Sequence, residues 1–323
     1  MATIKDVAKK AGVSISTASY ALNNQPNVHS KTREKILAAA KELNYYPNAS
    51  ARNLKTKRTG NIGFFIYGFD GPIFGDILEG VNNELQKKGF NIIVSSGESS
   101  AVILRERQVD AAIVFDSNLT DDTLLNYSEK YPVIVLDRDL KGKNIYKSQV
   151  DNKKAVERFI SEMVDKGYKK IAYLSGPKDS PSNLERYKGF CNALNEKGIK
   201  EFKHYEGDFT IGCGYELGKR IAQETEKPEF IYCANDESAV GVLQAFRELN
   251  VRIPDEISVA GFDGIMLGEY TIPNLTTIAI DYKDWGHNLA HFITVLLNEN
   301  EVLEIKGPEA KVKFKESTKW KNY

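Results

Sequence analysis

Residues 3–24 read TIKDVAKKAGVSISTASYALNN, and this stretch predicts two short helices joined by a tight turn. Apolar side chains recur at helical spacing in its first half, at Ile4, Val7, Ala8 and Ala11. Gly12 then ends the first helix, and Ser14 is placed to cap a second helix that runs to about Leu22. A helix-turn-helix is therefore expected at the start of the chain.

The outward face of the second helix carries small polar and phenolic side chains and almost no charge. This face consists of Ile15, Ser16, Ser19, Tyr20 and Asn23. Short side chains let a helix approach base edges in the major groove, and hydroxyls and amides hydrogen-bond with phosphates and bases. A third helix, which we expect Ser30 to cap, presents Lys and Arg outward. The pattern favours nucleic-acid recognition over an inert three-helix bundle.

Charge is divided unevenly along the chain, although 44 Lys and Arg balance 44 Asp and Glu. Residues 1–58 hold eleven basic and three acidic side chains, a net charge of +8, which leaves 33 basic and 41 acidic side chains, or −8, for the rest. A compact basic head can displace counterions from a phosphate backbone, whereas an acidic body is repelled by it. Charge alone leaves DNA, RNA, an anionic membrane surface and an inert surface open.

The chain of 323 residues is long enough for two or three folding units, and its 41% hydrophobic and 27% charged residues are typical of globular proteins. Neither a signal peptide nor an apolar run of membrane-spanning length is evident, so we expect a cytoplasmic protein. Cys191, Cys213 and Cys233 are few, odd in number and widely spaced, which favours reduced thiols over disulfides or a zinc site. We expect neither a metal nor a cofactor.

Beyond Gly60, short apolar runs alternate with amphipathic stretches. The runs are NIGFFIYGF, FNIIVSS, AAIVFD, PVIVLD, KIAYLSG, FIYCAND and ISVAGFD. Such alternation is typical of an α/β fold with a parallel sheet and right-handed crossovers. A second series begins near Asp151, which predicts two doubly wound lobes with a ligand held at the carboxyl ends of their strands.

We expect the chain to divide into three parts: a helix-turn-helix domain at 1–46, a hinge helix and linker at 47–59, and an effector-binding and dimerisation domain at 60–323. The last part would comprise a first lobe, about 60–150 plus 285–323, and a second lobe, about 151–284.

The opening stretch, together with VHSKTREKILAAAKELNYYPNASARNLK at 28–55, resembles the DNA-binding head of the lactose/galactose repressor family. The resemblance implies that bases are read by Ile15, Ser16 and Tyr20. It implies phosphate contacts by Ser14, Thr17, Ser19, Asn23, His29, Thr32, Tyr45 and Asn48. It also implies a hinge that folds only when two copies pack in the minor groove, with Ala51 as the small contact between them and Leu54 as the wedge between base steps. The segment 48–55 is too short to be a stable helix alone in water.

Tyr20 occupies a position where members of that family usually carry Arg. Arg offers two donors to the O6 and N7 acceptors of guanine, whereas Tyr has one hydroxyl and a ring that can touch a thymine methyl. Ala18 and His29 also depart from the usual Val and Ser. We therefore expect an operator that differs from the family's usual pattern at the half-site position facing Tyr20.

The resemblance continues through the body in RYKGF, GDFTIGCGY, ANDESAVG, ISVAGFD and IPNLTTI, and it implies a sensor similar to bacterial sugar-binding proteins, with a periplasmic-binding-protein-like fold. By this likeness the effector is bound by Phe74, Asp76, Asp137, Arg186, Phe209, Asn235 and Asp263. Polyols need paired acceptors and fork donors over an apolar face, and this set supplies them. An interlobe salt bridge is the alternative role for Arg186 and Asp263. The stretch SSGESSAVILRERQVD is shorter than usual in the family, which predicts a clipped helix in the first lobe, and DNKKAV lacks the usual Gly.

Two other constellations carry weaker signals. Gly212, Gly214 and Gly218 form a GxGxxxG run, but it lacks the flanking strand and acidic residue of a dinucleotide site. Asp284, His287 and His291 share one helical face, yet the Glu of a zinc-binding HExxH is missing, so a structural or partner-facing role is favoured over a metal site.

No G-x-S-x-G elbow or other catalytic set is convincing, so we do not expect an enzyme. We predict a sequence-specific transcriptional repressor that binds a roughly palindromic operator as a homodimer. A small molecule bound between the lobes would control its DNA affinity. A sugar or sugar phosphate is the leading candidate, and a corepressor of another type, such as a nucleobase, is the alternative.

Overall fold

The structure is a computed structural model that describes residues 2–23, 25–46, 53, 57–299 and 301–319. Its contacts separate two compact units, Met1–Thr59 and Gly60–Tyr323. Within the described ranges, no helix has both the length and the apolar character needed to cross a membrane.

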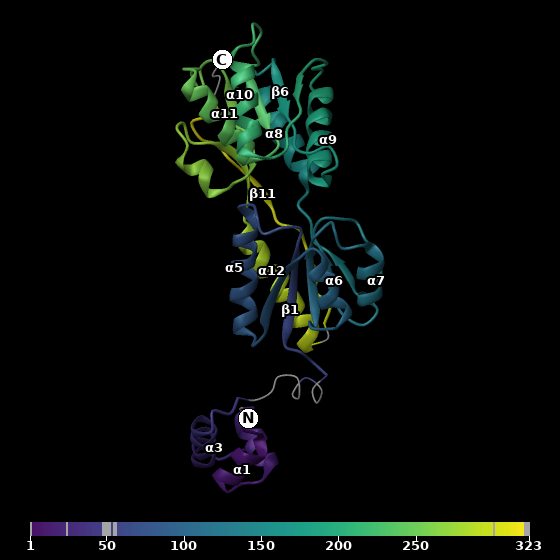
Figure 1. Ribbon diagram of the computed structural model, residues 1–323. Coiled ribbons are helices and arrows are strands. Elements are labelled where there is room, and N and C mark those ends of the chain that lie inside the picture. The colour runs from purple at the N-terminus through teal and green to yellow at the C-terminus, as the bar shows by residue number, and fades with distance from the viewer. Residues whose placement is uncertain (1, 24, 47–52, 54–56, 300, 320–323) are drawn as a thin grey trace. The chain divides into compact units, whose positions relative to one another are not determined.

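Residues 2–46 of the first unit, apart from residue 24, form a bundle of three short helices, α1 (Ile4–Ala11), α2 (Ile15–Leu22) and α3 (Ser30–Glu42), shown in purple in Figure 1. Gly12 ends α1 with a left-handed φ of +66°, as its place in the sequence predicts. The Ser14 hydroxyl oxygen accepts a hydrogen bond from the Thr17 backbone N–H at 3.1 Å, which confirms it as the N-cap of α2. The prediction for Ser30 is wrong, because α3 begins at Ser30 itself and His29 holds the N-cap position without a side-chain hydrogen bond.

Small side chains form the core of this bundle. The buried apolar residues are Val7, Ala8, Ala11, Ala18, Ala21, Val28, Ile36, Ala39 and Ala40. Each helix packs against the other two, and alanines at their crossings let helices of eight residues approach closely. The buried face of α2 is therefore packed against α1 and α3.

The second unit begins with a lobe built on a five-stranded parallel sheet of order β2-β1-β3-β4-β5. The strands are β1 (Asn61–Ile66), β2 (Asn91–Ser96), β3 (Ala111–Phe115), β4 (Val133–Val135) and β5 (Ile145–Lys147). One face packs on α5 (Ile73–Lys87) and α12 (Tyr282–Glu299), and the other on α6 (Glu98–Arg105) and α7 (Asp121–Ser128), as Figure 1 shows.

The second lobe has a six-stranded sheet of order β11-β10-β9-β8-β6-β7. Its strands are β6 (Ile171–Leu174), β7 (Lys203–Tyr205), β8 (Phe230–Cys233), β9 (Ser258–Asp263), β10 (Thr276–Ile280) and β11 (Ala310–Lys313). Its helices are α8 (Asn152–Asp165) and α9 (Pro181–Glu196) on one face, α10 (Ile211–Ala222) and α11 (Asp236–Glu248) on the other, and the 3-10 helix η1 (Met266–Tyr270). The predicted α/β fold, a helix-turn-helix followed by two parallel-sheet lobes, is confirmed.

The assignment of 285–323 to the first lobe needs one correction. Helix α12 does pack on α5 of the first lobe, but β11 pairs antiparallel with β10 and forms the edge of the second sheet. Strand β11 alternates between half-buried and exposed residues, as expected of an edge strand, and it covers backbone groups of β10 that would otherwise lie open. The chain thus returns to the second lobe at its end.

Glycines allow the closest helix contacts in the body. A Cβ on Gly80 of α5 would lie 2.0 Å from the Lys283 carbonyl oxygen, and a Cβ on Gly286 of α12 would lie 2.1 Å from that of Ile77. The GxGxxxG run has the same purpose, because Gly214 of α10 lies against Ser238 of α11, where a Cβ would be 2.2 Å from the carbonyl oxygen. The run is therefore a helix-packing motif.

Candidate DNA-reading face and effector site

The predicted base-reading residues share the exposed face of α2. Ile15 and Tyr20 are 47% and 43% exposed, and Ser16 is exposed as well, whereas Ala18 and Ala21 on the opposite face are buried. A β-branched apolar side chain and a phenol side by side on an uncharged helix face offer shape and single hydrogen bonds, which suits contact with base edges. The base-reading roles of these three side chains stay predictions.

Residues predicted to contact phosphates flank this face, and several are already oriented by local hydrogen bonds. The hydroxyls of Ser14 and Thr17 lie 2.8 Å apart, and the Asn23 side-chain amide donates to the Ser19 carbonyl oxygen at 2.8 Å. His29 is exposed before α3, while Thr32 and Tyr45 are half-buried. The remaining predicted DNA contacts, Asn48, Ala51 and Leu54, lie outside the described residues.

Arg186 of α9 is the centre of a buried polar cluster in the second lobe. Its Nε donates to Asn152 Oδ1 at 2.9 Å, its Nη1 to the Ala234 carbonyl oxygen at 2.5 Å, and its Nη2 to Asp263 Oδ1 at 3.2 Å. The guanidinium also lies 3.7 Å from the centre of the Phe262 ring. Every arm of this fork therefore has a partner, as a buried charge requires.

Asp263 connects the cluster to the first lobe. It ends β9 with a left-handed φ of +114°, which is rare for a residue with a side chain, and its Oδ1 also accepts the Tyr282 hydroxyl at 2.8 Å. Tyr282 begins α12, which packs on α5 of the first lobe. Burial raises the pKa of Asp263, although the neighbouring Arg186 opposes that rise.

Phe209 and Asn235 lie beside this cluster, beyond the carboxyl ends of β7 and β8, which flank β6 in the second sheet. The half-buried Phe209 has a left-handed φ of +72° and rests on Gly176, where a Cβ would lie 2.2 Å from its ring. The Asn235 side chain caps α11 by accepting from Ser238 N–H at 3.1 Å, and it donates to the Phe209 carbonyl oxygen at 2.8 Å. Four predicted effector residues, Arg186, Phe209, Asn235 and Asp263, are thus brought together.

The predicted residues of the first lobe are arranged differently. Phe74 is buried, and its ring packs edge-on against Tyr67 at 5.1 Å and Phe115 at 5.5 Å. Asp137 accepts from the Arg138 guanidinium at 3.0 Å, and Asp76 is exposed in the first turn of α5. The structure therefore engages Phe74 in packing and Asp137 in an ion pair.

Tyr67 and Glu237 belong beside the effector cluster, and sequence reasoning missed both. Burial raises the pKa of the half-exposed Tyr67 phenol, and the carboxylates of Asp263, Glu237 and Asp70 raise it further. Burial likewise raises the pKa of Glu237, with a further rise from Asp263 and Asp70. Tyr67 directly follows β1 and Glu237 lies in the first turn of α11, so their places after strands were the available signal.

The histidines of α12 contact an acid that the sequence did not identify. His287 Nδ1 and His291 Nδ1 lie 3.3 Å and 3.6 Å from the carboxylate oxygens of the buried Glu84 on α5. The nearby Asp284 instead accepts from the Asn288 side chain at 3.0 Å. Among the described residues no group of His, Cys, Asp and Glu is arranged to hold a metal. The contacts of His287 and His291 with Glu84 instead join α12 to α5.

The chain matches two family models. Residues 3–48 match bacterial regulatory proteins of the lacI family, and residues 160–318 match a periplasmic binding protein-like domain. The HTH-type transcriptional repressor PurR of Photobacterium profundum is 34% identical over 289 residues, covering 86% of each chain.

Solved structures give the same result. The lac repressor dimer bound to operator and the anti-inducer ONPF is 26% identical, with a TM-score of 0.84 and coverage of 98% of this chain and 99% of that one. A sugar-binding transcriptional regulator of the LacI family from Enterococcus faecalis is 30% identical, with a TM-score of 0.72 over 81% of this chain and 98% of that one. Proteins of this kind are transcription factors rather than enzymes. The chain belongs to the lacI family of bacterial regulatory proteins and is a DNA-binding transcriptional repressor.

Proposed function

We propose that two copies of the chain bind one operator, each reading a half-site with Ile15, Ser16 and Tyr20 of α2. Exposure of these side chains on a helix whose backbone is packed from beneath supports the assignment. A homodimer fits this role, because two-fold symmetry lets a roughly palindromic site be contacted twice and two modest affinities combine into a strong one.

Operator affinity is controlled by an uncharged polyol, a free sugar, bound where β9, α9 and Tyr67 meet. One observation carries this choice: the guanidinium of Arg186 is already paired with Asp263, while Glu237 and Asp70 add negative charge beside Tyr67. The carboxylates would repel a phosphate ester, whereas a sugar can donate hydrogen bonds to them from its hydroxyls and pack its apolar face on Phe209. A nucleobase is the rival, because the rings of Tyr67 and Phe209 also suit a flat heterocycle.

The Asp263–Tyr282 hydrogen bond gives the effector a route to DNA affinity. A sugar that accepts from Arg186 and donates to Asp263 changes how the second lobe holds the start of α12, and α12 packs on α5 of the first lobe. The effector shifts DNA affinity only as far as it binds the two lobe arrangements differently.

Thermal-shift screening of the full chain tests the effector class. The panel pairs free sugars with their phosphates and includes nucleobases, applied to the wild type and to Phe209→Leu. We expect a free sugar to raise the melting temperature, its phosphate to do so far less, and Phe209→Leu to lose the response. Stabilisation by a nucleobase alone, or equal stabilisation by sugar and sugar phosphate, would overturn the proposal.

A further inference from the structure

We propose that the first lobe has a second small-molecule site, between α6 and α7, which takes an organic anion such as a phosphate ester carrying a flat ring. A hollow of about 340 Å³ lies between these helices, within the size range of small-molecule sites. Helix α6 has eight residues, and the hollow opens along its carboxyl-terminal half.

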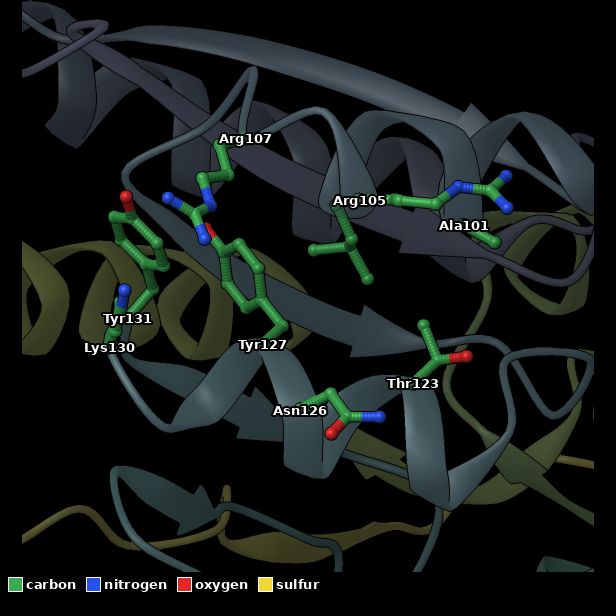
Figure 2. A pocket seen from close by; sticks show the side chains of 9 residues that line it. Ala101, Arg105, Arg107, Thr123, Asn126, Tyr127, Lys130 and Tyr131 are labelled. Atoms are coloured by element: carbon green, nitrogen blue, oxygen red, sulfur yellow. The ribbon is translucent and has the colours of Figure 1, made fainter.

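Three cations surround this hollow, and its lining contains no carboxylate. Arg105, Arg107 and Lys130 are exposed, and within the described part of the chain none of them forms an ion pair. Figure 2 shows Arg107 and Lys130 toward one end of the hollow and Arg105 toward the other. The body outside the head has a net charge of −8, so acidic partners are plentiful, and three unpaired cations around one hollow mark it as a place for an anion.

A second hollow, of about 720 Å³, provides the contrast. It lies beside β7 and α10, where Lys203 pairs with Glu224 at 2.6 Å and the Tyr205 hydroxyl donates to the same carboxylate at 2.9 Å. Lys203, Tyr205 and Glu224 are therefore partners of one another. The hollow between α6 and α7 lacks such internal neutralisation.

The backbone at Arg107 is an independent sign that its side chain is needed. Helix α6 ends in a Schellman motif, in which Gln108 N–H donates to the Ile103 carbonyl oxygen at 3.0 Å and Arg107 N–H to that of Leu104 at 3.1 Å. Arg107 has a left-handed φ of +55°, a conformation that Gly adopts without cost and Asn tolerates. Other helices in the described ranges that end with this bonding place Gly12, Asn44, Gly89, Gly167, Gly198 or Asn250 there. Arg is therefore less favourable in conformational free energy than Gly or Asn at this position.

Two stacked rings give the site its flat wall. Tyr127 and Tyr131 stack with ring centres 4.9 Å apart and planes inclined by 21°, and Figure 2 shows both at the end of the hollow where Arg107 lies. Tyr127 is buried, and its hydroxyl donates to the Val109 carbonyl oxygen at 2.8 Å, so its ring is held in place. A ligand with a ring can pack on this wall while its phosphate meets the guanidinium groups, and Thr123 and Asn126 add polar groups to the lining.

Calorimetric titration of the full chain with phenyl phosphate tests the site. For so small a probe we expect saturable one-to-one binding with a Kd of roughly 1 mM. Arg107→Gly should weaken it by about tenfold or more, because a charge-assisted fork is lost. The same change should leave the protein at least as stable, since Gly suits the left-handed position, so lost binding cannot be attributed to misfolding.

Matched controls separate this site from general effects. Asn250→Gly repeats the backbone change at the end of α11 without removing a cation, and Lys88→Gln removes an exposed cation at the end of α5, away from the hollow. Both variants should bind phenyl phosphate as the wild type does, and benzyl alcohol, which has the ring without the charge, should not bind. Absence of saturable binding at about 10 mM probe, equal weakening by Lys88→Gln, or capture of a poly-glutamate peptide without phenyl phosphate binding would overturn the proposal.

Discussion

The α2 face and the Arg186 cluster differ in where their polar groups come from and where they lie. The base-reading candidates Ile15, Ser16 and Tyr20 are exposed on one helix of eight residues. Arg186, Asp263 and Tyr282 are buried and come from α9, β9 and α12. A partner as large as DNA can be read by a local, exposed face, whereas a small effector has to be surrounded by groups that only the folded body assembles. Substitutions in the Arg186 cluster should therefore lower the stability of the body, whereas substitutions on the α2 face should change DNA recognition.

The largest expected effect is on the stability of the body. Arg186→Met leaves Asp263 buried without its cation, and removing one partner of a buried pair costs about 3–5 kcal/mol. The free energy of unfolding, measured with urea on the full chain, should fall accordingly. Arg252→Met is the matched control, because it breaks an exposed pair with Glu256 and should lower the free energy of unfolding far less. Equal losses in the two variants would contradict the structural role given to Arg186.

A carboxylate on the α2 face should abolish recognition without unfolding the protein. Ser16→Asp places a negative charge against DNA, and operator affinity should fall by about 100-fold or more, equivalent to about 2.7 kcal/mol. Fluorescence anisotropy with a selected operator measures this loss. Ala38→Asp, on the exposed side of α3 and outside the predicted contacts, should cause a much smaller loss. If both variants lost affinity equally, α2 would not be the reading element.

Tyr20→Arg should change which base is preferred rather than how stable the head is. Two guanidinium donors suit guanine, and a bidentate contact is worth about 1–3 kcal/mol of discrimination. Selection from a randomised half-site measures the preference at each position. Tyr20→Phe keeps the ring and removes the hydroxyl, so it separates hydrogen bonding from contact with a thymine methyl. An unchanged preference in Tyr20→Arg would remove Tyr20 from the base-reading set.

The smallest effect concerns the start of α1, where Asp6 accepts from the Thr3 backbone N–H at 2.8 Å. Hydrogen bonds from the Thr3 backbone and side chain lower the pKa of Asp6. A carboxyl whose folded pKa lies below its unfolded value stabilises the head above the unfolded pKa, and this contribution is lost as the pH falls through the folded pKa. Carboxyl chemical shifts in NMR should titrate below the usual Asp range. In Asp6→Asn, the melting temperature of the head should fall less steeply as the pH is lowered than it does in the wild type. An identical pH dependence in the two proteins would show that the capping interaction contributes nothing.

Local signals were readable from the sequence, and tertiary ones were not. Gly12 and Ser14 were predictable because a left-handed C-cap and a side-chain N-cap depend on neighbours within a few residues. The place of β11 was not, because an edge strand pairs wherever a free sheet edge is available.

The same distinction between local and tertiary signals applies to the candidate effector site. Arg186 and Asp263 were found through resemblance, and their contact is present. Tyr67 was missed because it comes near Asp263 only where the two lobes meet, and Glu237 and Tyr282 were missed because they reach Asp263 from helices that follow other strands of the second sheet. Phe74 was expected to contact the effector, yet its ring is buried against Tyr67 and Phe115, which a hydrophobic residue in the first turn of a helix does not reveal.

The central claim is that the body controls what the head does, and its direct test is the operator Kd of the full chain with and without a saturating sugar identified by thermal shift. We predict a change of about 5-fold to 150-fold, the usual range of coupling between two sites. Phe209→Leu should bind operator as the wild type does without sugar and show no change when sugar is added. An operator Kd that stays the same at a sugar concentration that fully stabilises the body would contradict the account.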